Sequence, residues 1–117
     1  MTRRTRAARV LLAAALIVAI VMALIPAPPD LGVGDKWQHM TAFGTLTILY
    51  AAAFPRASLL RIGERLSFLG ALIEVFQSIP ALHRDCDVMD WVADTFIIVV
   101  VVLVVRIARG RRAPRRR

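Results

Sequence analysis

The chain has 117 residues, of which 58% are hydrophobic, and a formal net charge of +8. This length is typical of one domain, and the mean hydropathy of +0.64 excludes an ordinary soluble domain. The basic residues form no helix face with interleaved aromatic side chains, so we expect no binding to nucleic acid. The single cysteine excludes an internal disulfide bond and a cysteine-based metal site. The composition therefore predicts a small integral membrane protein.

The first predicted element is a membrane helix over residues 8–25. Four arginines lie within residues 1–9, and an unbroken apolar run extends from Val10 to Ile25. With two preceding alanines the segment reaches roughly the 17 to 20 residues that a bilayer requires. Prolines crowd the place where a signal peptidase would cut, and the chain that follows is also hydrophobic. We therefore expect the helix to be retained.

Three further apolar segments are predicted to be helices, over residues 37–54, 66–80 and 90–107. The third is the least hydrophobic, because Glu74 and Gln77 interrupt it. A membrane-spanning strand would need a closed barrel, and the chain has too few alternating segments to build one. The sequence therefore predicts an all-α fold, in which residues 1–117 form a single domain and an integral membrane four-helix bundle.

The distribution of charge predicts the orientation of this bundle. Of the sixteen basic residues, fourteen lie in the two tails and in a middle loop, residues 55–65, and the exceptions are Lys36 and Arg84. Of the eight acidic residues, all but Glu64 lie in or against the other two loops. Arginine-rich loops stay in the cytoplasm. We therefore expect a multi-pass protein of the cytoplasmic (inner) membrane, with both termini cytoplasmic and the acidic loops outside.

Polar side chains gather at the predicted outer ends of the helices. Glu74 and Gln77 are three residues apart and share a helix face, and Asp90 and Asp94 share a face of the fourth helix. Glu74 lies on the order of 9 Å below the end of its helix, too deep for a solvated position. Ionisable groups at such depth must pair, be neutralised, bind an ion or face a cavity. The cluster is therefore a candidate functional site.

Several of these residues also have structural explanations. Glu74 can hold the bundle together through an interhelical hydrogen bond, with Gln77 as its simplest partner. Asp85 and Asp87 are more typical of loop solvation or helix capping than of chemistry. His39 can be an interfacial hydrogen-bonded group, a proton carrier or a ligand.

The order of the motifs resembles the VanZ-like family over most of the chain. DKWQH at residues 35–39 matches the family's DKxxH, and EVFQSIP at residues 74–80 matches its ExxQ and proline. Asp94 stands where the family usually has asparagine, and Ile97 stands where a glycine often allows close helix contact. The resemblance and the polar faces together predict these ligand-binding residues: Asp35, Lys36, His39, Glu74, Gln77, Arg84, Asp87, Asp90 and Asp94.

The family takes its name from a protein associated with resistance to the glycopeptide teicoplanin, so the resemblance implies a role in the bacterial cell envelope. Our first hypothesis is an outward-facing site that binds or modulates a lipid-linked or cell-wall-related anionic ligand. Lys36 and Arg84 would be its cationic contacts. The expected partners are membrane lipid and a lipid-linked cell-wall precursor. A link to glycopeptide resistance is left open.

Two other functions also stay open. A metal-assisted intramembrane hydrolase or phosphoryl transferase would use His39 or Glu74 as its base. Its divalent cation would be held by oxygen ligands, with Asp87, Asp90 and Asp94 as candidates. The sequence favours binding over catalysis, because no nucleophile has an evident activating partner. A divalent cation is the cofactor that it leaves open. A proton-coupled carrier would need a homo-oligomer, because four short helices do not enclose a pathway alone.

Overall fold

The computed structural model describes residues 1–25, 32, 34–82 and 87–112. These residues form four α-helices and one short 3-10 helix, and no strand occurs in this part of the chain. The prediction of an all-α chain with four helices is confirmed. In chain order the elements are α1 (Arg3–Leu24), α2 (Asp35–Ala53), α3 (Leu59–Gln77), η1 (Pro80–Leu82) and α4 (Val88–Arg112).

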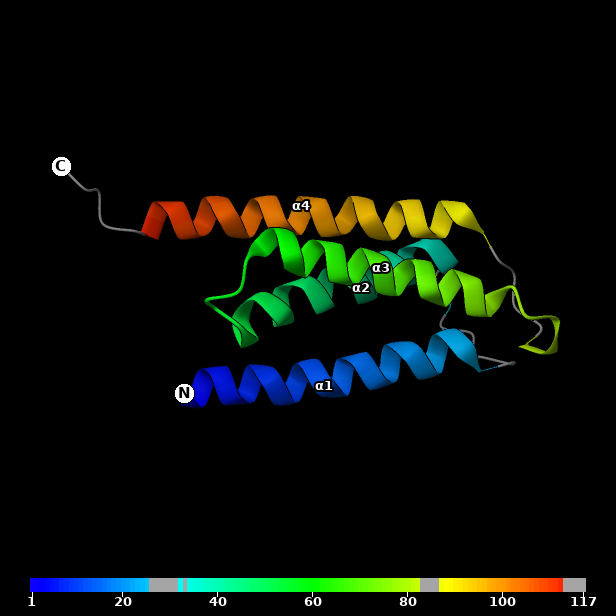
Figure 1. Ribbon diagram of the computed structural model, residues 1–117, viewed down its shortest axis with the longest axis horizontal. Coiled ribbons are helices and arrows are strands. Elements are labelled where there is room, and N and C mark those ends of the chain that lie inside the picture. Colours follow the sequence, from blue (N-terminus) through cyan, green and yellow to red (C-terminus); the bar gives the residue numbers. More distant parts are fainter. Residues whose placement is uncertain (26–31, 33, 83–86, 113–117) are drawn as a thin grey trace.

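The four helices alternate in direction. Figure 1 shows α1 and α3 running one way and α2 and α4 running the other way, so the start of α1 and the end of α4 lie at the same end of the molecule. We call this end, which also holds the turn between α2 and α3, the basic end. The opposite end holds the starts of α2 and α4 and the last turn of α3, and we call it the acidic end. Helix α2 packs against all three other α-helices.

Helix α3 begins at Leu59. The sequence had predicted a start at residue 66, so the observed helix begins about two turns earlier. Ser58 is its N-cap, and the Ser58 hydroxyl oxygen accepts a hydrogen bond from the backbone N–H of Arg61. The arginine-rich stretch that the sequence assigned to the middle loop is therefore largely helical. Helices α1 and α4 also extend beyond their predicted ends, to Arg3 and Arg112, because arginine is a good helix former.

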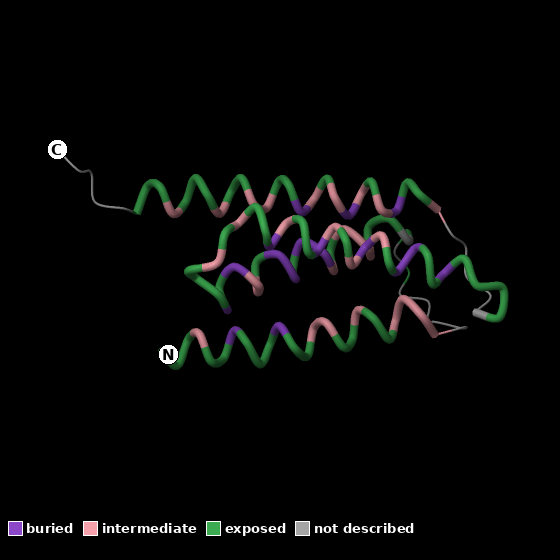
Figure 2. The backbone as a smooth tube through the Cα atoms, in the orientation of Figure 1, coloured by how far each residue is buried: buried purple, intermediate pink, exposed green. Residues whose placement is uncertain are grey.

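The core is a thin apolar seam between the helices. Figure 2 shows that the buried positions face the inside of the bundle and that the outer sides of α1 and α4 are mostly exposed. All four α-helices contribute larger buried apolar side chains: Leu12, Phe43, Leu46, Ile62, Leu66, Ile73 and Ile98.

A glycine on α2 makes room for α4. A Cβ atom at Gly44 would lie 3.3 Å from Cγ1 of Ile97, which is closer than an ordinary van der Waals contact. The large side chain is on α4 and the small residue is on the facing helix, so the two helices can pack closely at this point.

The outer surfaces of α1 and α4 are apolar. Val10 and Ile17 of α1 are each 65% exposed, and Phe96 and Val104 of α4 are 61% and 60% exposed. Soluble monomers rarely expose contiguous apolar surfaces of this kind. Both helices are long and apolar enough to cross a membrane, judged by length and composition.

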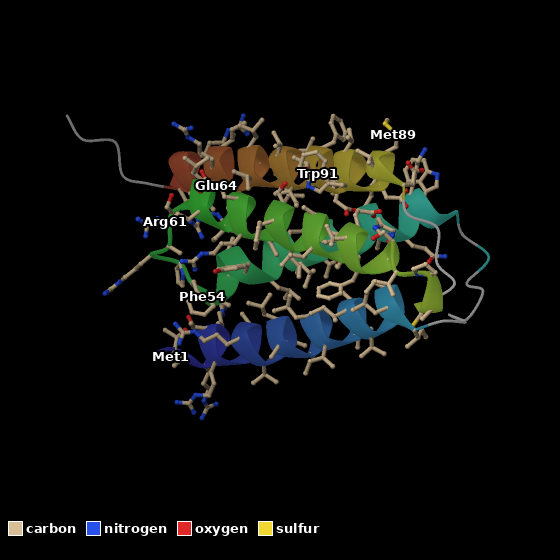
Figure 3. The ribbon with its side chains drawn as sticks, turned by 45° about the vertical axis from the view of Figure 1, so that its right-hand side comes forward. Met1, Phe54, Arg61, Glu64, Met89 and Trp91 are labelled. Carbon is tan, nitrogen blue, oxygen red and sulfur yellow. The ribbon has the colours of Figure 1, made fainter. Side chains whose placement is uncertain are left out.

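Arginines at the basic end bond to the last turn of α2. Nε of Arg9 donates to the carbonyl oxygen of Ala53 at 2.9 Å, and Nη2 of Arg109 donates to that of Ala51 at 2.9 Å. Carbonyl groups in the last turn of a helix lack a partner within the helix. The Arg9 guanidinium also lies 4.4 Å from the ring centroid of Phe54, which Figure 3 labels at this end together with Met1. The arginines thus connect α1 and α4 to α2.

Candidate functional site

Three ionisable side chains from three helices meet near the acidic end. One nitrogen or oxygen atom each of His39 on α2, Glu74 on α3 and Asp90 on α4 lies within 4.8 Å of the other two. Glu74 is 6% exposed and Asp90 is 3% exposed. The imidazole of His39 is 9% exposed. We call these three residues the ionisable cluster, and it lies between the helices and not on a solvated face.

Asp94 lies one helical turn after Asp90 and faces the imidazole of His39. Its two carboxylate oxygens are each 3.4 Å from Nδ1 of His39, and the Asp94 side chain is 1% exposed. Gly70 on α3 leaves the space that Asp94 occupies, since a Cβ atom at Gly70 would lie 3.2 Å from Oδ2 of Asp94. Because Nδ1 faces Asp94, the other ring nitrogen, Nε2, points to the opposite side of the imidazole.

Asp87 connects the end of α3 with the start of α4. Its backbone N–H donates to Oε2 of Glu74 at 3.1 Å, and its own Oδ1 accepts from the backbone N–H of Met89 at 2.9 Å. The second bond is that of a helix N-cap, which is one of the two structural roles expected for Asp87. The other carboxylate oxygen of Glu74, Oε1, is buried and has no hydrogen-bond partner among the described residues.

Gln77 ties α3 to α1. Its Nε2 donates to the carbonyl oxygen of Ala23 at 2.8 Å, in the last turn of α1. This bond satisfies a carbonyl group that has no partner within its own helix. Gln77 is 2% exposed, and its Oε1 has no hydrogen-bond partner in the described part of the chain. The hydrogen bond found for Gln77 is therefore to α1, where the sequence suggested Glu74 as the partner.

Three more residues predicted for the site are Asp35, Lys36 and Arg84, and Asp85 was expected in the same loop. Lys36 is exposed on the first turn of α2. Asp35 is described through its backbone, as the first residue of α2. Arg84 and Asp85 lie outside the described residues.

Sequence reasoning missed the bonds that hold α3 and α4 together beside the cluster. The hydroxyl groups of Ser67 and Thr95 are 2.9 Å apart, and Nε1 of Trp91 donates to the carbonyl oxygen of Ser67 at 3.0 Å. The spacing of these residues could have predicted the contact. Trp91 and Thr95 share a face of α4, and the small residues Ser67 and Gly70 share a face of α3.

An apolar cavity of about 500 Å³ lies beside the cluster, between α1 and α2, with Ile73 of α3 at its wall. Gln38 and His39 belong to its lining, and the other lining residues of α2 extend along the helix to Leu46. The apolar cavity therefore reaches one residue of the ionisable cluster, His39. Its lining on α1 is Ala15, Val18, Ala19, Met22 and Ala23.

Comparisons with protein families, with curated proteins and with solved structures found no match for this chain. What the site can bind is therefore inferred from the side chains that line it. Two carboxylates and an imidazole can bind a cation or exchange protons, and the adjacent cavity has the apolar character that a hydrocarbon chain requires.

Proposed function

We propose that the chain is a VanZ-like integral membrane protein of the bacterial cell envelope, in which all four α-helices span the inner membrane. Helices α2 and α3 have 19 residues each. At 1.5 Å per residue they measure about 28 Å, close to the ~30 Å hydrocarbon core of a bilayer. The exposed apolar surfaces of α1 and α4 suit a lipid environment. The arginines support a cytoplasmic location for the basic end, which leaves the acidic end outside.

We propose further that the acidic end binds a lipid-linked or cell-wall-related anionic ligand. The observation that carries this proposal is the apolar cavity that reaches His39. From Gln38 to Leu46 its lining follows α2 for about 12 Å, at 1.5 Å per residue. A hydrocarbon chain would occupy this space, and a head group would lie among the polar residues at the acidic end. Exposed Lys36 and, from the sequence, Arg84 supply positive charge for that head group.

The test is binding of a polyisoprenyl phosphate to the purified full-length protein in detergent, with the corresponding polyisoprenol as the uncharged comparison. Ala19 lines the cavity, so Ala19→Leu places a larger side chain in it. Ala14 is exposed on the same helix and does not line the cavity, so Ala14→Leu is the matched control. We expect Ala19→Leu to weaken binding by on the order of 10-fold, which corresponds to about 1.4 kcal/mol.

Two results would contradict the proposal. Equal affinity of the Ala19→Leu and Ala14→Leu variants would show that the cavity does not hold the chain of the lipid. Equal affinity for the phosphate and the alcohol would show that the site does not recognise an anion.

A metal-assisted hydrolase or phosphoryl transferase is the second candidate, favoured by the close grouping of His39, Glu74 and Asp90. The hydroxyl groups of Ser67 and Thr95 bond to each other, so neither has an evident activating base. Release of phosphate from the polyisoprenyl phosphate, measured in the same preparation, separates the two candidates. We expect binding without release.

A further inference from the structure

We propose that His39, Glu74 and Asp90 form a binding site for a divalent transition-metal ion, with Asp94 as the residue that orients His39. The sequence had suggested Asp87, Asp90 and Asp94 as metal ligands. Of these three, Asp90 belongs to the ionisable cluster, whereas Oδ1 of Asp87 accepts a capping bond at the start of α4.

The spacing of the cluster suits one ion. The three candidate ligand atoms all lie within 4.8 Å of one another. An ion with bonds of about 2.1 Å holds its ligand atoms roughly 3.0 to 3.4 Å apart, so modest rotation of the side chains closes the site. Each ligand comes from a different helix, and a bound ion would therefore join α2, α3 and α4.

The burial of the carboxylates points to a positively charged ligand. Glu74, Asp90 and Asp94 are 6%, 3% and 1% exposed. Buried charges are unfavourable unless they are paired or coordinate a metal. Oε1 of Glu74 lacks a hydrogen-bond partner among the described residues, although the other oxygen of the same carboxylate accepts from Asp87. A divalent cation would occupy the coordination position that this oxygen offers.

The interaction of Asp94 with His39 is of the kind that supports a metal-binding histidine. A histidine that binds a metal through one ring nitrogen usually directs the other to a carboxylate, which fixes the orientation of the ring. The carboxylate of Asp94, at 3.4 Å from Nδ1, leaves Nε2 on the side away from Asp94.

The ligand set indicates which ions the site would prefer. Imidazole nitrogen suits zinc and other transition metals, and carboxylate oxygen is shared by zinc and manganese. Magnesium and calcium are usually held by oxygen ligands alone. We therefore expect Zn²⁺ or Mn²⁺ to bind more tightly than Mg²⁺.

The experiment uses the full chain in detergent, without a polyhistidine tag, after treatment with a chelator. ZnCl₂, MnCl₂ and MgCl₂ are the probes, each added alone, and bound ion is measured by mass spectrometry of the metal content and by competition with a chromophoric chelator. We expect about one Zn²⁺ or Mn²⁺ ion per chain, and a rise in the thermal unfolding temperature when it binds.

Isosteric variants test which side chains bind the ion. Glu74→Gln and Asp90→Asn each replace a ligand carboxylate by an amide, and we expect affinity to fall at least about 100-fold. Asp94→Asn removes the orienting carboxylate, for which a fall of about 10- to 100-fold is expected. Glu64 is an exposed carboxylate on α3, at the basic end, so Glu64→Gln is the matched control and should bind as the wild type does.

Wild-type protein that binds neither Zn²⁺ nor Mn²⁺ overturns the inference, and this measurement does not depend on the folding of any variant. Equal affinity of Glu74→Gln, Asp90→Asn and wild type also overturns it, as does an equal loss in Glu64→Gln. The lipid-linked ligand is absent from these measurements. Their failure would therefore leave the proposed binding function standing.

Discussion

Replacement of Gly70 by alanine tests how tightly Asp94 is held against His39. A Cβ atom at Gly70 would lie 3.2 Å from Oδ2 of Asp94 and 3.4 Å from Cδ1 of Trp91. The carboxylate of Asp94 would have to retreat by a few tenths of an ångström, but its side chain is 1% exposed and already faces the imidazole. The Trp91 ring is held by its bond to the Ser67 carbonyl oxygen. Movement of either side chain would therefore disturb a contact that it now makes.

The magnitude follows from two opposing contributions. Alanine stabilises a helix by about 1 kcal/mol relative to glycine. Overfilling a packed interior costs about 1 to 3 kcal/mol. We therefore expect Gly70→Ala to lower the free energy of unfolding by about 1 kcal/mol, taking the middle of the overpacking range.

Gly63 on the same helix provides the control. A Cβ atom at Gly63 would lie 3.6 Å from Cγ2 of Ile98 and 3.7 Å from Cγ2 of Val102, which are ordinary contacts. Gly63→Ala should therefore raise stability by about 1 kcal/mol, and the two variants should differ by about 2 kcal/mol.

The assay is equilibrium unfolding of the detergent-solubilised protein, followed by circular dichroism as a denaturing detergent is added. Zinc affinity of both variants is measured alongside, and we expect it to fall for Gly70→Ala alone. If both alanine variants were stabilised equally, Asp94 would be free to shift. The account of a tightly positioned carboxylate beside His39 would then be wrong.

Two further outcomes are expected. In a Cys86→Ser background, an impermeant thiol reagent applied to intact cells should label Met89→Cys but not Ser58→Cys, because the basic end is expected in the cytoplasm; labelling of Ser58→Cys would reject that orientation. Arg84→Lys keeps the charge but loses the planar guanidinium, so it should bind the polyisoprenyl phosphate less tightly than wild type, with its amount in the membrane unchanged. Unchanged binding in Arg84→Ala would remove Arg84 from the site, and full rescue by lysine alone would reduce it to a counter-charge.

The apolar runs predicted the number and class of the helices, because each run is long and ends at a proline or a charged turn. They did not predict the start of α3, since arginines beside Glu64 suit either an interfacial loop or the first turn of a helix. The juxtaposition of His39, Glu74 and Asp90 was predictable, because short connections make successive helices antiparallel and bring their polar ends together.

Other features of the site have no signature in a single sequence. The bond from Gln77 to α1 ends on a backbone carbonyl group, which every residue carries. The cavity depends on how α1 lies against the bundle. The buried residues of α1, Ala8 and Leu12, are near the basic end. The cavity borders the second half of α1, from Ala15 to Ala23. Such spacing is set by packing between helices and not by the pattern within one of them.

The two arginine bonds at the last turn of α2 form at different times in the synthesis of the chain. Arg9 is made before α2, so its bond to Ala53 can close as soon as the first pair of helices has assembled. Arg109 lies near the end of α4, so its bond to the carbonyl oxygen of Ala51 can form only after α4 has been made. Until then the carbonyl group of Ala51 lacks the arginine to which it bonds in the folded chain. A nascent chain that stalls before Arg109 therefore lacks this link between α4 and α2 at the basic end.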